Sequence, residues 1–358
     1  MVRLALAWAV WGTSTATTLS SPPPFLRGAD LSSVPQYEGA GIVFKDSGQA
    51  KPALAIFRDH GANCVRLRLF VHPTGHGEVV NGLAYTVSLA KQAKALGFLI
   101  LLDLYYSDTW ADPGHQVIPE AWKNLALPEL VKQVRDYSAE TVKVFAASGA
   151  APDLVQVGNE INNGLLRPLG GFDDQSIPEA QAYDHMADLL KAGIEGVRQS
   201  APGAVIMIHA ANGERTERVR HFFGALIERR VPFDMVGLSY YPALGGKLAQ
   251  LTATMDLIAT TYEKPVAIVE TAYPYRPVGT KSEKPAFAWP LTPEGQRDYL
   301  LDLTKALKSV PHGLGAGFFY WHPDSVRAGS LPLWRQGSMA LFDPANEALP
   351  ALTAFQGP

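Results

Sequence analysis

Two glutamates in this chain each follow directly on a short apolar run. Glu160 ends the segment VQVGNE, and Glu270 ends the segment VAIVE. A buried carboxylate without a partner is costly, so two that face one another across a cavity should acquire different pKa values. One then stays protonated as an acid while the other stays ionised as a nucleophile, and such a pair can cleave a glycosidic bond. Each glutamate alone could instead cap its strand or pair with an arginine, but the matched pair favours catalysis.

Polar residues beside these glutamates could support the same chemistry. Arg66 and Arg68 are two residues apart in an apolar run, so they share one face of a strand. If Arg66 points inward, it can hold Glu270 ionised by its charge and its hydrogen bonds. A purely structural ion pair is the alternative. Asn159 could hydrogen-bond a sugar hydroxyl or could cap its strand.

Aromatic residues follow several of the same apolar runs. Flat rings can cover the C–H faces of a sugar while polar edges bind its hydroxyls. Each ring could instead pack in the core, and Trp321, which directly ends the last run, is the best candidate for sugar binding. The rings are those of Trp110, Trp122, Tyr240, Tyr241, Tyr273, Tyr275, Trp321 and Trp334.

Strand patterns and helix patterns alternate along the chain. The strand patterns are apolar almost throughout, as in a parallel sheet whose outer face is covered. They fall at 25–30, 64–71, 98–104, 154–158, 204–209, 235–239, 266–269 and 317–320. Helix patterns fall at 51–60, 83–96, 129–147, 178–199, 215–230, 249–262 and 294–309, with a less regular one at 345–355.

This alternation predicts the α/β class and a (β/α)8 TIM barrel, formed as a single domain over 25–358. Active sites of such barrels lie at the carboxyl ends of the strands, where Glu160 and Glu270 end the fourth and the seventh. A doubly wound parallel sheet is the alternative, but no G-x-G-x-x-G follows a strand.

Composition excludes several classes of partner. The net charge is −3 among 358 residues, so no basic excess points to nucleic acid. A charged start, an apolar run at 4–11 and small residues up to Ala16 predict a signal peptide at 1–16, a linker at 17–24 and secretion; a frayed tail is the alternative. No other apolar stretch approaches membrane-spanning length, so we expect no membrane association.

The single cysteine, Cys64, should be a buried inert thiol.

Other catalytic machinery is not apparent in the sequence. There is no H-E-x-x-H, and His72 and His76 lie in a Gly/Pro loop without a suitably spaced carboxylate, which argues against a catalytic metal. The absence of G-x-S-x-G argues against a serine hydrolase. Bulky Tyr273 and Trp321 follow the last two strands in place of the glycines of a phosphate-binding barrel.

Motifs spread along the chain resemble those of glycoside hydrolase family 53, the arabinogalactan endo-β-1,4-galactanases. They extend from about residue 28 to 343, and SDTWADP and GNEI are the most specific. The matching segments are ADLSS (29–33), NCVRLRLFVHP (63–73), YYSDTWADPGHQ (105–116), VQVGNEINNGLL (155–166), VGLSYYP (236–242), KPVAIVETAYPY (264–275), LTPEGQ (291–296) and ALFD (340–343).

The resemblance implies a retaining mechanism with Glu160 as the acid/base and Glu270 as the nucleophile. A retaining pair should have its carboxyl groups about 5–5.5 Å apart. The resemblance also implies substrate-binding roles, which fall on Arg66, Asn159, Tyr105, Asp108, Trp110, Tyr241 and Trp321.

It further implies a polysaccharide partner, galactan or the arabinogalactan side chains of pectin, bound by a secreted protein that we expect to be a monomer. We expect no cofactor, although some relatives bind calcium in a late loop. Asp324 and Asp343 could contribute to such a structural site.

Three positions depart from the family pattern. Tyr105 replaces a usual histidine, Arg167 a usual tryptophan, and Ala243-Leu244 stand where another tryptophan is usual. Two lost rings predict weaker stacking at some sugar subsites. The same chemistry on another β-linked polysaccharide such as mannan, or a non-catalytic glycan-binding barrel, therefore remain as alternatives.

Overall fold

The structure, a computed structural model, describes residues 24–172, 176–244, 246–277 and 288–356. The predicted signal peptide at 1–16 lies outside the described residues, as does the predicted linker apart from its last residue. Both assignments stay predictions.

Eight parallel strands form a closed barrel in which neighbours in the sequence are neighbours in space. β12 pairs with β1, and this pairing closes the barrel. Each predicted strand is present, with ends that differ by at most two residues, and the predicted (β/α)8 fold is confirmed. The strands are β1 (Leu26–Asp30), β4 (Cys64–Leu69), β5 (Leu99–Leu104), β6 (Leu154–Val157), β9 (Val205–Ala210), β10 (Met235–Ser239), β11 (Val266–Thr271) and β12 (Gly315–Tyr320).

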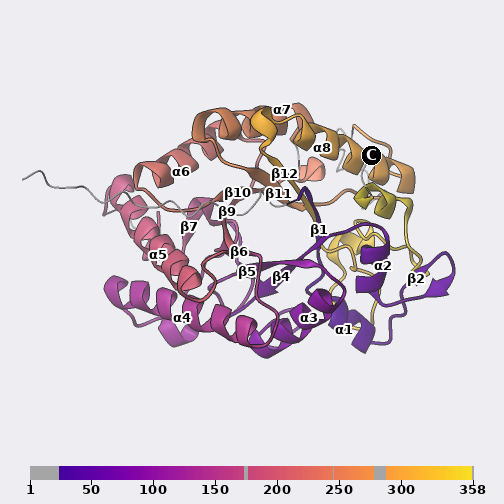
Figure 1. Cartoon of the computed structure of the whole chain (residues 1–358), viewed down its shortest axis with the longest axis horizontal. Helices are drawn as coiled ribbons and strands as arrows, with labels where there is room; N and C mark the ends of the chain where they lie inside the picture. Colours follow the sequence, from indigo (N-terminus) through magenta and orange to yellow (C-terminus); the bar gives the residue numbers. More distant parts are fainter. Residues whose placement is uncertain (1–23, 173–175, 245, 278–287, 357–358) are drawn as a thin grey trace, which may run out of the picture.

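Helices surround the strands as an outer layer (Figure 1). They bury their apolar faces against the outer side of the barrel, where most of the core lies. They are α1 (Val34–Gly39), α2 (Ala53–Asp59), α3 (Leu83–Ala95), α4 (Leu127–Ala147), α5 (Glu179–Ser200), α6 (Thr216–Glu228), α7 (Leu248–Leu257), which continues as the π-helix η4 (Ile258–Tyr262), and α8 (Pro293–Lys308).

The last predicted helix, 345–355, is wrong in its first half. Ala348 donates its backbone N–H to Lys45 and Leu349 donates to Leu341, so this stretch pairs with other segments. Two 3₁₀ helices, η6 (Trp334–Gly337) and η7 (Pro350–Phe355), follow β12 within the described part of the chain, and η7 covers the second half of the predicted helix. Conversely, the six-residue α1 was not predicted, because it is too short to show a helical period.

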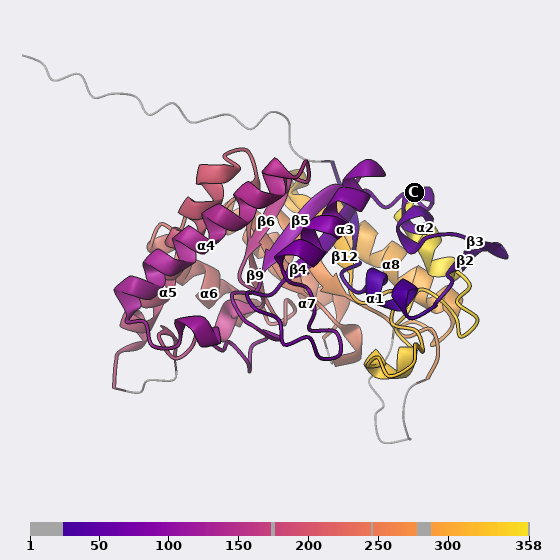
Figure 2. The same ribbon diagram turned by 90° about the horizontal axis from the view of Figure 1, so that it is seen from below.

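Two short hairpins lie outside the barrel. β2 (Lys45–Asp46) and β3 (Gln49–Ala50) pair with each other and project from one edge of the molecule (Figure 2). β7 (Gly164–Leu165) and β8 (Gly170–Gly171) pair within the loop that follows β6, just beyond Glu160. This second hairpin therefore borders the carboxyl end of the barrel.

The barrel interior changes from apolar to polar toward the carboxyl ends of the strands. Side chains two residues apart on a strand point to the same face, and β4, β5, β6 and β9 each add one apolar and one polar inward residue in this way. The apolar layer includes Cys64, Leu101, Leu154 and Met207, and the buried residues two positions further on are Arg66, Asp103, Gln156 and His209. Cys64 is a buried free thiol, as predicted.

Close packing at the amino-terminal end of the interior needs a glycine. A Cβ at Gly28 would lie 2.2 Å from the ring of Phe319. The ring fills the space beside Gly28 as part of the apolar layer of the interior.

No described helix is long and apolar enough to cross a membrane.

Candidate active site

A cavity of about 460 Å³ opens at the carboxyl end of the barrel. Both glutamates line it, together with most of the other predicted site residues. Arg66 lies fully buried behind them. The predicted residues in the lining are Tyr105, Trp110, Asn159, Glu160, Tyr241, Glu270 and Trp321.

Glu160 lies in the turn that follows β6, in a left-handed backbone conformation with φ of 48°. This conformation is uncommon for a residue other than glycine and is a feature of functional sites. The hydroxyl of Ser239, at the end of β10, donates to Oε1 of Glu160 at 2.6 Å. The backbone N–H of Glu160 points at Nδ1 of His209, 3.3 Å away.

Glu270 lies on β11 and is 5% exposed. Its Oε1 is 2.9 Å from Nη1 of Arg66, and its Oε2 accepts a hydrogen bond from the Tyr241 hydroxyl at 3.0 Å. A shift in register between β10 and β11 places Ser239 opposite Glu270. The bulge therefore brings the partner of Glu160 and the second carboxylate to the same level of the barrel.

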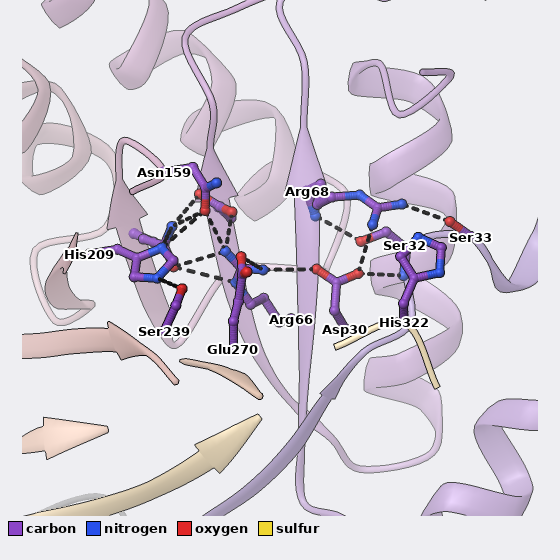
Figure 3. Close-up of polar contacts among 12 residues, drawn as sticks. Asp30, Ser32, Ser33, Arg66, Arg68, Asn159, His209, Ser239, Glu270 and His322 are labelled. Carbon is purple, nitrogen blue, oxygen red and sulfur yellow. Dashed lines mark hydrogen bonds and ion pairs between the residues drawn. The ribbon is translucent and has the colours of Figure 1, made fainter. Parts of the chain in front are cut away.

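Arg66 connects the two halves of the site (Figure 3). The predicted ion pair with Glu270 is present. Arg66 also donates to Asp30 at 3.1 Å, to Asp103 at 2.6 Å and to Oδ1 of Asn159 at 2.7 Å. The contact with Glu270 and the structural ion pairs with Asp30 and Asp103 are therefore present together, because one guanidinium has enough N–H groups for all three.

Burial raises the pKa of the Glu160 and Glu270 carboxyl groups, but their main charged neighbours act in opposite directions. At Glu160 the negative charge of Glu270 adds to the rise. At Glu270 the positive charge of Arg66 and the hydroxyl of Tyr241 oppose it. Glu270 therefore loses its proton before Glu160 does, which is the division of roles that the sequence predicts.

Aromatic rings form one wall of the cavity. The rings of Trp110 and Trp321 meet edge to face with centroids 6.1 Å apart. Tyr105 is buried against Phe70 and Trp110, so it supports this wall more than it contacts solvent.

A further ring, that of Trp334, lines the cavity next to Tyr241, at a centroid distance of 6.0 Å. The other four aromatic candidates do not line this cavity, and Tyr275 lies under the guanidinium of Arg276, 5.6 Å from the ring centre. Trp122 contacts Tyr137, whereas Tyr240 and Tyr273 pack against Tyr299.

Asp108 lies apart from the other predicted binding residues. Its carboxylate accepts the backbone N–H groups of His72 at 2.8 Å and of Glu120 at 2.9 Å. It is not among the residues that line the cavity. Asp108 therefore ties two loops together, and a contact with substrate stays a prediction.

Asn159 is buried beside Glu160 and makes several contacts with the protein. Its Oδ1 accepts from Arg66, and its Nδ2 donates to the carbonyl of Ala111 at 2.8 Å. These bonds fix the orientation of the amide in the cavity wall.

Sequence reasoning did not single out His209, Ser239, Gln156 or Asp103. Each is a polar residue in an apolar run and is buried at the same level as Arg66 or just above it. Counting in steps of two from the apolar interior residues would have placed His209, Gln156 and Asp103 inside the barrel. Their partners depend on barrel closure, which the sequence does not show directly.

The predicted calcium ligands lie in different settings. Asp324 is buried next to His322, and Asp343 accepts the backbone N–H groups of Ala345 and Glu347 at 2.8 and 2.9 Å. Across the described ranges, no three His, Cys, Asp or Glu side chains come together in a way that could hold a metal ion. Calcium binding stays a prediction.

Comparison with known proteins agrees with this geometry. Residues 26–355 match the family described as Glycosyl hydrolase family 53. The arabinogalactan endo-beta-1,4-galactanase of Cellvibrio japonicus is 35% identical over 95% of this chain and 93% of its own length. A probable arabinogalactan endo-beta-1,4-galactanase A of Aspergillus terreus is 36% identical over 92% of this chain and 95% of its own.

Solved structures show the same relationship. The GH53 catalytic domain of Ignisphaera aggregans superposes with a TM-score of 0.84 at 32% identity, covering 94% of this chain and 97% of that one. A fungal beta-1,4-galactanase gives 0.83 at 30% identity, covering 94% and 100%. A GH113 beta-1,4-mannanase, at 14% identity and a TM-score of 0.56, shares only the fold.

Proposed function

We propose, since this chain belongs to glycosyl hydrolase family 53, that it is a retaining endo-β-1,4-galactanase in which Glu160 and Glu270 carry out the reaction. The roles of the two glutamates are assigned from one observation: the two carboxyl groups share a cavity but have neighbours of opposite charge. Glu270 is paired with Arg66, whereas Glu160 faces the charge of Glu270 without a cation at contact distance among the described residues.

The first step forms a covalent intermediate. The carboxylate of Glu270 attacks the anomeric carbon, and the bond from that carbon to the leaving oxygen breaks. Glu160 gives its proton to this oxygen as the bond breaks. Arg66 and Tyr241 hold the Glu270 carboxylate from both of its oxygens, so the nucleophile is fixed in position before substrate binds.

The second step releases the sugar. Glu160, now ionised, takes a proton from water, whose oxygen bonds to the anomeric carbon while the bond to Glu270 breaks. Two displacements at one carbon retain its configuration. The separation of about 5–5.5 Å between the carboxyl groups that this mechanism requires stays a prediction.

The substrate proposal rests on the relatives and on the rings in the cavity. Both curated relatives described above are named as galactanases. Trp110, Trp321 and Trp334 supply flat apolar surfaces against which galactose units can pack. Mannan is less favoured, because the mannanase resembles this chain in fold alone.

Tyr105, Ala243 and Leu244 are the unusual residues that line the cavity. Leu244 is 66% exposed at its rim. An exposed leucine covers less of a sugar ring than a tryptophan does, so we propose weaker binding at the subsite next to it.

We also propose that the protein is secreted. A polymer from pectin side chains cannot enter a cell intact, which agrees with a signal peptide at 1–16. We propose that the secreted protein acts as a monomer, since both glutamates and the rings around them come from one chain.

The test is digestion of purified potato-type galactan and of mannan. We expect the wild type to release galacto-oligosaccharides and to lower the viscosity of galactan early, as an endo-acting enzyme does. Glu160→Ala and Glu270→Ala should lose this activity, whereas Glu294→Ala, on the outer helix α8, should keep it. Wild-type levels of activity in either active-site variant would rule out the proposed roles, and binding of galactan without cleavage by the wild type would favour the non-catalytic barrel.

A further inference from the structure

His209 and Ser239 lie next to one another (Figure 3), and each of them contacts Glu160. His209 Nε2 is 2.8 Å from Ser239 Oγ, and Ser239 Oγ is 2.6 Å from Glu160 Oε1. On the other side of the same ring, Nδ1 is 3.3 Å from the backbone nitrogen of Glu160. The imidazole therefore contacts both the main chain and, through Ser239, the side chain of the proposed acid.

The backbone contact identifies which ring nitrogen carries the proton. A backbone N–H can only donate, so the Nδ1 that faces it must offer a lone pair. Nε2 of Gln156, 3.1 Å from Nδ1, is a second donor on the same side. Burial, with the charge of Arg66 adding to it, lowers the pKa of His209 well below its usual value, so the ring is neutral and its one proton lies on Nε2.

One neighbour would favour the opposite arrangement. Oδ1 of Asn159 lies 3.0 Å from the same Nδ1. This oxygen already accepts from Arg66, and the amide cannot turn because its nitrogen donates to Ala111. A proton on Nδ1 would add one bond to a satisfied acceptor but leave the buried N–H of Glu160 without a partner, which costs more.

We propose that His209 and Ser239 form a hydrogen-bond chain with one fixed direction, which confines the acidic proton of Glu160 to Oε2. Nε2–H of His209 donates to Ser239 Oγ, so the hydroxyl of Ser239 must donate onward to Oε1. Oε1 is thereby an acceptor, and the transferable proton resides on the other oxygen. The inference rests on the proposed role of Glu160 as the acid/base.

The chain serves both steps of the reaction without changing. In the first step the proton leaves from Oε2, and in the second a proton from water returns there, while Oε1 accepts from Ser239 throughout. Polar groups that need not reorient during the reaction contribute most to catalysis. His209 and Ser239 are thus positioning residues that act through Glu160.

The same hydrogen bond affects titration. A hydroxyl that donates to a carboxylate stabilises its ionised form, so Ser239 lowers the pKa of Glu160 against the rise caused by burial. Other charged or titratable groups interact with Glu160 or line the same cavity. They are the carboxyl groups of Glu270, Asp112 and Glu214, the cations Arg66 and Arg335, and Tyr105, Tyr241 and His209.

The first test is the pH profile of kcat/KM for Ser239→Ala. We expect its alkaline limb to move upward by about one pH unit, and kcat to fall about tenfold with little change in KM. Ser239→Thr, which keeps a hydroxyl, should restore the wild-type limb. Ser138→Ala, which removes a buried hydroxyl bonded to Tyr106 on the outer side of the barrel, should leave the limb unchanged.

The second test reads the tautomer directly, in the wild-type enzyme, from the ¹⁵N NMR signals of His209. We expect Nε2 protonated and Nδ1 unprotonated throughout the active pH range. A protonated Nδ1, or an unmoved alkaline limb in folded Ser239→Ala, would overturn the inference; if that variant does not fold, the NMR result decides. Activity retained in Glu160→Ala would instead overturn the proposed function.

Discussion

Arg66 and Arg68 enter the barrel interior from the same strand, two residues apart, but the protein holds them in different ways. Arg66 is surrounded by oxygen atoms of Asp30, Asp103, Asn159 and Glu270. Its guanidinium is therefore fixed by hydrogen bonds and charge on every edge. Only one of these partners, Glu270, belongs to the proposed reaction.

Arg68 is held mainly by its flat face. It donates to Ser33 at 2.7 Å and lies 3.6 Å from Asp30, but its Nε has no hydrogen-bond partner. The guanidinium carbon is 4.8 Å from the ring centre of Trp110 and 5.1 Å from that of Trp321. Hydrogen bonds and ion pairs therefore fix the Arg66 charge beside the proposed nucleophile. Arg68 mainly supports the aromatic wall, to which Arg66 adds one contact at 5.5 Å from the ring centre of Trp321.

The largest effect should follow the loss of the Arg66 charge. Arg66→Met would leave Asp103 and Glu270 buried without their cation, and Asp30 with Arg68 alone. Removing one partner of a buried pair costs about 3–5 kcal/mol, so we expect a large fall in the free energy of unfolding and no measurable galactan cleavage. Chemical denaturation would measure the loss of stability and a reducing-sugar assay the loss of activity. A stable, active Arg66→Met would contradict the proposal that these carboxylates need the Arg66 charge.

A smaller effect should follow the loss of geometry alone. Arg66→Lys keeps the charge but offers one ammonium group in place of the planar fork, so it cannot reach Glu270 and Asp103 together. We expect kcat to fall about 100-fold, because a slightly misplaced nucleophile is costly, with KM nearly unchanged. Steady-state kinetics on galactan would measure this, and a rise in KM alone would mean that Arg66 acts on substrate binding.

Arg68→Lys should affect binding more than chemistry. A lysine loses the stacking face that supports Trp110 and Trp321, while Arg66 and Glu270 keep their contacts. We expect KM to rise about fivefold with kcat changed less than twofold, as cation–π contacts are worth about 0.5–2 kcal/mol. A fall in kcat as large as that of Arg66→Lys would show that the two arginines do not differ in the way described.

The smallest effect on the site is expected at Asp324, a buried residue whose charge acts on Arg68. Burial raises the pKa of this carboxyl group to about 7. The folded state then binds more protons than the unfolded state between the ordinary pKa of an aspartate and about 7, so stability should fall as pH rises through this window and stay level above it. Asp324→Asn should remove this fall in stability, because an amide does not titrate.

The thermal midpoint should test this difference. We expect Asp324→Asn to gain about 5 °C relative to the wild type at pH 8 compared with pH 4, measured by circular dichroism at both values. A difference between the two proteins that does not change with pH would show that Asp324 is already ionised in the folded state.

The fold and the centre of the site could be predicted from the sequence because both depend on local sequence patterns. Apolar runs of strand length alternate with helical periods, and the two glutamates end two of those runs. The pairing of Arg66 with Glu270 could be predicted because inward positions on a strand follow a period of two.

Contacts that depend on closure of the barrel were harder to predict from the sequence. His209 and Ser239 meet Glu160 only because β6, β9 and β10 are adjacent in the closed sheet. Asp108 follows a strand as the catalytic residues do, yet its carboxylate binds loop N–H groups, an alternative that sequence pattern does not separate from a binding role.

The central claim is that Glu270 forms a bond to the sugar, and trapping that bond tests it most directly. A 2-deoxy-2-fluoro galactobioside with a good leaving group should form the glycosyl–enzyme quickly and release it slowly. Mass spectrometry of the digested protein should then find one added disaccharide on the peptide that contains Glu270, and none in Glu270→Gln. A label on Glu160, or turnover of galactan to products of inverted configuration, would contradict the account.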